Sequence, residues 1–395
     1  MSVLSFFYGF SVPSVISVSS VLNYGVASMA RSLSPWLPLA ASGALAAAML
    51  NCSNPSAPDS AAGDRGGIPR HAEITVTPQQ SGTTNRLQAI SPVNDQIAWA
   101  SGVGGTYAVT TNGGATWHSA VVPGAEALQF RDVEGLTAKK AYLLAAGTGT
   151  DSRIYKTEDG GEHWTLQFQN EDPNAFYDCF SFWNPRRGVT MSDAANGVFP
   201  VIRTTDGETW TNIGNRLPAA QAGEAAFAAS GTCVATQGND LAWIATGGAA
   251  KARILATTDG GDTWTAYDTP VVQGTASSGG ISVAFRDALH GILGAGELAV
   301  TDAFSDNVAT SGDGGKTWQL AQHPTFTGSI YGLAYVPHTT TVIATGPVGA
   351  SWTPDEGAHW FALDTATNYW AVAFASSKAG WLVGTDGRIA KVSLK

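Results

Sequence analysis

Few side chains in this sequence combine the types and the spacing that catalysis or metal binding requires. The seven histidines include His163 and His359, but no two of the seven have the close spacing of a metal site. The glycine-rich run AAGTGTDSR, residues 145–153, lies between short predicted strands, whereas a dinucleotide-binding loop opens a helix. The sequence therefore predicts no metal and no cofactor, and it argues against a dinucleotide-dependent oxidoreductase.

The composition indicates many short strands joined by tight turns. The 395 residues include 46 glycines and 13 tryptophans, and charged residues make up only 13% of the chain. Such a composition is typical of an all-β fold. The 21 Lys and Arg residues against 31 Asp and Glu give a net charge of −10, and no basic run is present. We therefore expect no binding to nucleic acid.

Residues 1–52 differ from the rest of the chain and have the layout of an export segment. Met29 opens a second start with one basic residue, Arg31, followed by an apolar stretch and small residues, as in a secretory signal. Met29 is thus a candidate for the true initiator, and a long signal or a membrane segment at 1–28 is the alternative.

Cys52 ends this segment, and the small polar residues 53–72 predict a flexible linker. A cysteine followed by a tether resembles a bacterial lipoprotein, in which Cys52 would carry the lipid. The alternative is an ordinary cleaved signal and an incidental cysteine. Both readings predict an exported protein, either periplasmic or a lipoprotein of the outer membrane or cell surface.

A motif of the form Ser/Thr-x-Asp/Asn-x-Gly-x-x-Trp recurs along the chain. It reads TTNGGATW, TEDGGEHW, TTDGGDTW, SGDGGKTW and TPDEGAHW, and TTDGETW is the same motif with one glycine fewer. Its third residues are Asn112, Asp159, Asp206, Asp259, Asp313 and Asp355, and its tryptophans are Trp117, Trp164, Trp210, Trp264, Trp318 and Trp360. The tryptophans lie 42–54 residues apart, a period typical of propeller blades.

Each repeat contains the pattern of a four-stranded blade. Within 281–320, the segments ISVAFRD, GILGAG, NVATSG and TWQLAQ predict four strands. Seven segments can form innermost strands: RLQAISPV, ALQFRDV, YDCFSFW, GTCVATQ, GISVAFRD, IYGLAYV and YWAVAFAS. The sequence thus predicts a seven-bladed β-propeller over 73–395. Its last repeat lacks a fourth strand, which EITVTP at 73–78 would supply, closing the ring.

We interpret the repeated motif as the hairpin between the third and outer strands of a blade. Its Asp or Asn side chain can accept backbone N–H groups in the turn, and its glycines allow positive φ. The tryptophan would begin the outer strand and pack against its neighbours. A device that recurs in every blade is structural, whereas a catalytic site is needed once.

These repeats are similar to Asp-boxes, also called bacterial neuraminidase repeats. Beyond them, AFAASGT (226–232), SSGGISVAFRD (277–287), HGILGAG (290–296) and GWLVGTDGRIAK (380–391) resemble the photosystem II assembly/stability factor-like propellers, in a bacterial branch often labelled "oxidoreductase". The resemblance covers about 73–395. It implies a propeller, and its photosynthetic members assist assembly of a membrane complex. A shared fold does not transfer a function by itself.

True sialidases also contain Asp-boxes, but they need further residues. The family's Phe/Tyr-Arg-x-Pro element is absent, and the nearest segment, NRLQA at 85–89, lacks the proline. Other glycosidases of this repeat class need two carboxylates at a set separation, which sequence alone does not give.

We expect a ligand to bind on the face opposite the repeated turns, where loops differ between blades. The loops that lead into the inner strands carry Arg86, Glu126, Asp178, Glu224, Ser278, Tyr331 and Trp370; the loops between second and third strands carry Asp193, Arg253, Asp302 and Asn307. Cys179 and Cys233 occupy equivalent positions in adjacent inner strands, so they would form either a disulfide or two buried thiols.

The sequence favours a non-catalytic exported scaffold, expected to be a monomer, that binds a protein partner or helps assemble a membrane-associated complex. The alternatives are an extracellular glycosidase, sialidase-like or of another Asp-box type, and a carbohydrate-binding protein. A funnel with convergent carboxylates would favour the enzyme, and a broad face would favour protein binding.

Overall fold

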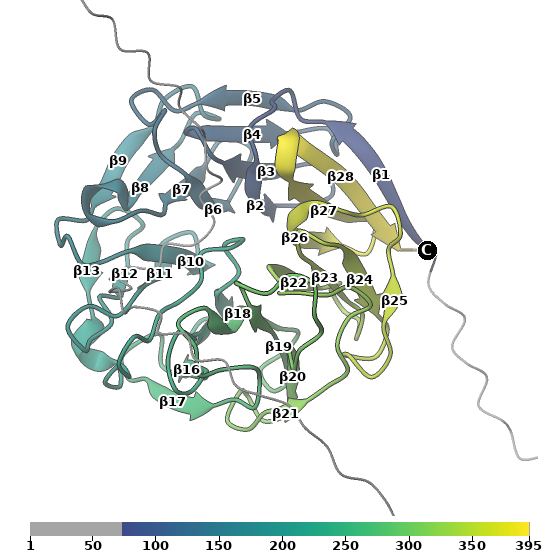
Figure 1. Ribbon diagram of the computed structural model, residues 1–395. Coiled ribbons are helices and arrows are strands. Elements are labelled where there is room, and N and C mark those ends of the chain that lie inside the picture. The colour runs from purple at the N-terminus through teal and green to yellow at the C-terminus, as the bar shows by residue number, and fades with distance from the viewer. Residues whose placement is uncertain (1–72, 395) are drawn as a thin grey trace, which may run out of the picture. The chain divides into compact units, whose positions relative to one another are not determined.

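The computed structural model describes residues 73–394, which form seven four-stranded antiparallel sheets. The export segment, Cys52 and the linker predicted over 53–72 lie outside the described residues. Figure 1 looks onto the disc, with the sheets arranged as blades around a central axis. The seven-bladed β-propeller predicted from the repeats is therefore confirmed.

Each blade contributes one strand to the inner wall, and we number the blades one to seven in the order of these strands. The inner strands are β2 (Leu87–Pro92), β6 (Phe130–Gly135), β10 (Tyr177–Asn184), β14 (Val234–Gln237), β18 (Ser278–Phe285), β22 (Gly332–Tyr335) and β26 (Tyr369–Ser376). The second strands are β3 (Ala98–Gly102), β7 (Ala141–Ala145), β11 (Arg187–Ser192), β15 (Leu241–Ala245), β19 (Gly291–Glu297), β23 (Val342–Thr345) and β27 (Ala379–Gly384).

The outer half of each blade completes the sheet. The third strands are β4 (Thr106–Thr110), β8 (Arg153–Thr157), β12 (Ile202–Thr204), β16 (Arg253–Thr257), β20 (Val308–Ser311), β24 (Ala350–Thr353) and β28 (Arg388–Leu394). The outer strands are β5 (His118–Val121), β9 (Thr165–Gln169), β13 (Trp210–Asn212), β17 (Thr265–Asp268), β21 (Gln319–Leu320), β25 (Phe361–Ala362) and β1 (Ile74–Gln80). Three short 3-10 turns, Gly149–Asp151, Gly214–Arg216 and Thr385–Gly387, lie in the connections.

The ring is closed by pairing the start of the described chain with its end. Strand β1 runs antiparallel to β28, from Ile74 opposite Leu394 to Gln80 opposite Arg388. This confirms the predicted closure and removes an open sheet edge. Gln79 fastens the seam, since its Oε1 accepts the indole N–H of Trp117 at 3.0 Å and of Trp381 at 3.1 Å. The first and seventh blades are thus joined by side chains as well as by the sheet.

The repeated motif lies between the third and outer strands of six blades, and we call each copy a repeat turn. In every copy the Asp or Asn oxygen accepts a backbone N–H near the tryptophan, at 2.8–3.0 Å. The hydroxyl of the first Ser or Thr also holds the turn, because it accepts the N–H of the buried glycine at 2.8–3.0 Å in all six copies. The sequence interpretation did not include this role of the hydroxyl.

The two faces of the disc differ in what they carry. The repeat turns bond to the hairpins between inner and second strands, as in Gly260 N–H to Asp240 O and Gly314 N–H to Leu289 O, both 2.9 Å. We call this side the turn face. The loops that lead into the inner strands and the loops between second and third strands meet on the opposite side, which we call the loop face.

The cores lie between adjacent blades. Between blades three and four, Cys179 and Cys233 form a disulfide with a Cα–Cα distance of 5.9 Å, inside an apolar cluster that includes Met191 and Phe199. The structure thus selects the disulfide from the two alternatives left open by the sequence.

Candidate functional site

Five inner strands carry a β-bulge at the same position near the loop face. The pairing of β2, β6, β10, β18 and β26 with their second strands skips one residue each: Gln88, Arg131, Asp178, Ile281 and Trp370. A bulge turns the extra side chain away from the regular alternation of the strand. The bulges therefore place one side chain from each of these five blades at the loop-face end of the axis.

Contacts between blades that are not neighbours place these side chains together at the axis. Ile281 and Trp370 form one buried apolar cluster with Ala229 of blade four and Tyr331 of blade six. The Tyr331 and Trp370 rings meet edge to face, with centroids 5.0 Å apart. We call the five bulged residues together with Tyr331 the bulge ring; its members are Gln88, Arg131, Asp178, Ile281, Tyr331 and Trp370. Tyr331 is included because it directly precedes β22, much as Trp370 lies at the start of β26.

The bulge ring has an apolar half and a polar half. Blades five to seven supply Ile281, Tyr331 and Trp370, and blades one to three supply Gln88, Arg131 and Asp178. The Arg86 guanidinium connects the two halves, because it lies 4.4 Å above the Trp370 ring. A cation over an indole face is an attractive contact.

Charges in the polar half are tuned by burial. Asp178 is only 1% exposed, and burial, followed by the charge of Asp193, raises its pKa well above the usual range. Burial raises the pKa of Asp193 to about 7. The two carboxyls share a side-chain hydrogen bond, and Asp193 also accepts the Ala226 N–H at 3.1 Å. Burial lowers the pKa of Arg131, although nearby Asp178 opposes this. The pair therefore carries less negative charge than two free carboxylates.

Several polar atoms of the ring have no hydrogen-bond partner within the described protein. These atoms are Oε1 and Nε2 of Gln88, Oδ2 of Asp178 and the indole nitrogen of Trp370, together with Nε of Arg86. Gln88 is 0% exposed and Trp370 is 7% exposed. Buried polar atoms are normally bonded, so donors and acceptors left over at one place mark a site that can accept a ligand.

A segment of blade four crosses the axis beneath this ring. The carbonyl of Ala228 accepts Arg131 Nη1 at 3.3 Å, and the hydroxyl of Ser230 donates to the Tyr331 carbonyl. Gly231, at φ +75°, has no room for a side chain, because a Cβ would lie 2.3 Å from Asp132 Oδ1. Residues 225–233 thus touch blades two and six, and we call them the crossing segment. For this reason the inner strand of blade four begins at Val234 rather than at the predicted 231.

The structure brings Arg86, Asp178, Asp193, Tyr331 and Trp370 together at the loop-face end of the axis. The other residues expected on this face are not part of the ring. Glu224 is buried in an ion pair with Arg253 and also accepts the Thr246 hydroxyl at 2.7 Å. This pair fastens the loop that leads into the crossing segment.

The remaining predicted residues have local roles or are exposed. Glu126 accepts the Gly124 N–H at 3.0 Å, and the Ser278 hydroxyl accepts the Thr275 N–H at 3.0 Å. Asn307 is buried and donates to the Gly328 carbonyl at 3.1 Å, while Asp302 is exposed in the loop before it. The loops of the loop face occupy equivalent places in the repeats, but their side chains therefore differ in how near they lie to the axis.

Sequence analysis missed Gln88, Arg131, Ile281 and the crossing segment. An alignment of the inner strands would have revealed Gln88 and Arg131, because each follows the first strand residue of its blade as Asp178 and Trp370 do, whereas Ile281 is the fourth residue of β18. No feature of the sequence indicated that 225–233 would cross the axis.

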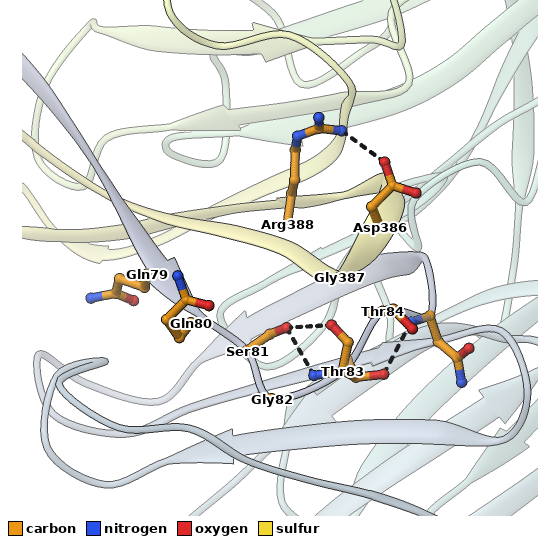
Figure 2. A pocket seen from close by; sticks show the side chains of 10 residues that line it. Gln79, Gln80, Ser81, Gly82, Thr83, Thr84, Asp386, Gly387 and Arg388 are labelled. Atoms are coloured by element: carbon orange, nitrogen blue, oxygen red, sulfur yellow. Dashed lines mark hydrogen bonds and ion pairs between the residues drawn. The ribbon is translucent and has the colours of Figure 1, made fainter.

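Two other places have features of a site. A cavity of about 700 Å³ lies at the seam, lined by residues 79–85 and 386–388 (Figure 2). Figure 2 shows that several of its polar groups bond to one another, as in Arg388 with Asp386 and Ser81 with Thr83. On the turn face, Asp159, Glu162 and His163 have potential ligand atoms within 4.8 Å of one another, but Asp159 already holds its repeat turn. Neither place has unpartnered buried groups like those of the bulge ring.

No family model matches the sequence, and no curated protein matches it. Among solved structures, "YCF48 bound to D1 peptide" is similar with a TM-score of 0.57 and 16% identity, covering 82% of this chain and 97% of that one. YCF48 from Cyanidioschyzon merolae has a TM-score of 0.57 and 15% identity, covering 80% and 98%. The GH74 xyloglucanase from Xanthomonas campestris has a TM-score of 0.54 and 16% identity, covering 80% of this chain and 53% of that one. In the part of the chain that the structure describes, no helix is long and apolar enough to cross a membrane. At these identities, the comparisons show that the chain has the fold of these propellers.

Proposed function

We propose that this protein is a non-catalytic propeller that binds an extended segment of a protein partner at the bulge ring, as a step in assembling a membrane-associated complex. The observation that carries the proposal is the ring itself, in which unpartnered donors and acceptors face an aromatic wall. An extended backbone offers alternating N–H and C=O groups to such atoms, while its side chains occupy apolar pockets. A propeller of similar fold is known with a bound peptide, which agrees with this mode.

The carboxyl geometry supports binding rather than hydrolysis. Glycosidases of the two-carboxylate type hold their carboxyls about 5–9.5 Å apart, so that a sugar and a water fit between them. Asp178 and Asp193 are instead joined by a hydrogen bond, and Asp178 is buried. Glu224, the other acid expected near this face, is neutralised by Arg253. The Asp178–Asp193 pair is therefore closer than the separation that this type of glycoside cleavage needs.

Gln88 offers a test that separates binding from folding. Replacing it with Met keeps the length of the side chain and removes two buried unpartnered polar atoms. Because such atoms cost stability when unbonded, Gln88→Met should leave the free protein as stable as wild type or more so. If the atoms bind the partner, the same change should weaken capture about tenfold, or roughly 1.4 kcal/mol.

The experiment compares immobilised variants of the full chain for capture from membranes of the native host, with cross-links mapped by mass spectrometry. Gln237→Met is the matched control, since Gln237 also has an unpartnered Oε1 but lies at the turn-face end of β14. Cross-links to the ring that disappear in Gln88→Met and persist in Gln237→Met support the proposal. Equal capture by all three proteins would refute it, as would hydrolysis of xyloglucan or a sialyloligosaccharide that Asp178→Asn abolishes.

We also propose that the protein works outside the cytoplasm, as a lipoprotein anchored through Cys52. The support is the Cys179–Cys233 disulfide, which forms and persists in oxidising compartments. Metabolic labelling with a palmitate analogue tests the anchor. Label that is lost in Cys52→Ala supports it, and label that stays would show that the lipid lies elsewhere. Mature protein that begins after residue 53 and carries no label would instead be a freely soluble exported form.

A further inference from the structure

A second set of equivalent positions lies on the inner strands, on the turn-face side of the bulge ring. Six members pair with a Trp, Tyr or Ile of their second strand, as in Glu134 with Tyr142 and Ala373 with Trp381, and one pairs with Val189. The seven members are Ser91, Glu134, Ser181, Ala235, Ala284, Ala334 and Ala373. We call them the lower ring. All seven line one cavity of about 400 Å³, which Ser230–Thr232 of the crossing segment also line.

Glu134 differs from the other six members. Four blades have alanine and two have serine at this position, so blade packing does not need a long or charged side chain here. Among the described residues, Glu134 has no hydrogen-bond or ion-pair partner, and it is partly exposed to the cavity. The cavity lining contains no Lys, Arg or His. A carboxyl without a counter-charge in a confined space costs stability, and the fold gains no packing in return.

The second acid of the lining is already bonded. Asp132, two residues before Glu134, accepts the backbone N–H of Phe180 at 2.8 Å and of Val133 at 2.7 Å. Its oxygens therefore hold strands β6 and β10 together, and its charge is directed at the backbone. Glu134 is left as the free acceptor of the cavity.

The walls suit an organic cation. The hydroxyls of Ser91 and Ser181 contribute polar groups to the lining, whereas the rings of Phe180 and Phe285 pack into the cores between blades. A cavity of this size is in the range of small-molecule sites. We propose that the lower ring is a second binding site, which takes a guanidinium or primary ammonium group paired with Glu134. This site lies on the other side of the crossing segment from the bulge ring and does not depend on the partner proposed there.

The test uses n-butylguanidinium as the probe, titrated calorimetrically into the full chain, and n-butylurea as a neutral probe of the same shape. We expect saturable one-to-one binding of the cation and none of the urea. Glu134→Gln should weaken binding at least tenfold. Glu162→Gln removes the same charge from an exposed repeat turn and should leave binding unchanged. Ala373→Val, which fills part of the cavity and keeps Glu134, should also weaken it, with melting curves checking that each variant folds.

Proton linkage gives an independent readout. Burial raises the pKa of Glu134 to about 8. The titratable groups that line the same cavity are Asp132 on its own strand and Tyr335 on β22, whose hydroxyl donates to Glu356 at 2.9 Å. Because a guanidinium stays charged over this range, affinity should rise from pH 6 to about pH 8 and then level off. Glu134→Gln should remove this dependence.

The results also distinguish the source of the cation. A hairpin peptide with arginine at its tip that binds more tightly than n-butylguanidinium indicates a side chain of a partner, and the reverse indicates a free small molecule. The proposal is overturned if no saturable binding occurs, if the urea binds as well as the cation, or if Glu134→Gln binds as wild type. Failure here would leave the Gln88 experiment unaffected, since the two sites have no residue in common.

Discussion

Thr257→Val should destabilise the propeller more than its small chemical change suggests. Thr257 is 2% exposed and begins the repeat turn of blade four. Its hydroxyl accepts the N–H of Gly261 at 3.0 Å and donates to Asp259 Oδ1 at 2.8 Å. Valine has nearly the same shape, so the substitution removes these bonds with little change in packing.

The size of the effect follows from which partner is left without a bond. The Gly261 N–H is buried, so leaving it unsatisfied costs about 1–3 kcal/mol. Losing the bond to the Asp259 carboxylate adds to this, and we expect about 2–3 kcal/mol in total. Thr263 is the matched control, because its hydroxyl also donates to Asp259, at 2.6 Å, but is exposed. Water can replace that bond, so Thr263→Val should cost less than about 1 kcal/mol.

Equilibrium unfolding in urea, followed by tryptophan fluorescence, measures both variants. Partner capture per folded molecule should stay unchanged, because the turn lies on the face opposite the bulge ring. Equal unfolding free energies for the two variants would refute the reasoning, since they would show that the buried glycine N–H does not depend on the hydroxyl. Unchanged unfolding with lost capture would mean that the repeat turns bind the partner rather than support the fold.

Three further predictions concern stability. Replacing Cys179 and Cys233 together by alanine should lower the unfolding free energy by about 4 kcal/mol, the value for a cross-link spanning 54 residues, and a reductant should have the same effect on wild type but none on the variant. Hydrogen bonds from the backbone N–H groups of Thr209 and Glu208 lower the pKa of Asp206 to about 2, so the stability it contributes is present above pH 4 and is lost as the pH falls toward 2. Urea midpoints should thus fall less steeply with acid in Asp206→Asn than in wild type. Burial raises the pKa of Asp193 to about 7, so the stability that its protonated carboxyl contributes is complete below pH 4 and decreases as the pH rises toward 7. Asp193→Asn keeps an acceptor for the Ala226 N–H and should reduce this loss of stability. An unchanged dependence of stability on pH would contradict the raised pKa.

The sequence by itself determined the architecture, because the repeat turns are local. The hydroxyl of Thr257, the carboxylate of Asp259 and the glycine N–H they hold lie within five consecutive residues, so each turn can form wherever its residues occur. Six copies at a near-constant spacing fix the number of hairpins. The unpaired last repeat then requires a strand from the start of the propeller, which β1 supplies.

The candidate site could be predicted only in part, because it depends on contacts that are not local. Asp178, Tyr331 and Trp370 were candidates because they stand at or next to the start of inner strands, but Glu224 and Ser278, expected on the same set of loops, lie in local contacts. Asp178 and Trp370 are the extra residues of β-bulges, whereas the bulge of the strand that begins at Ser278 turns Ile281 toward the axis instead. A bulge is a property of the pairing between two strands, and neither strand shows it alone.

Only the tertiary structure decided which residues meet across the axis. Arg131 of blade two contacts Ala228 of blade four, 97 residues later, because the crossing segment leaves its own blade. Glu134 resembles any polar residue of a strand until closure of the ring places it among six small side chains in one cavity. Such contacts depend on how seven sheets close around an axis, and the pattern within any one repeat carries no information about the others. The repeats therefore specify the scaffold, and the departures from the repeat become a site only when the ring is closed.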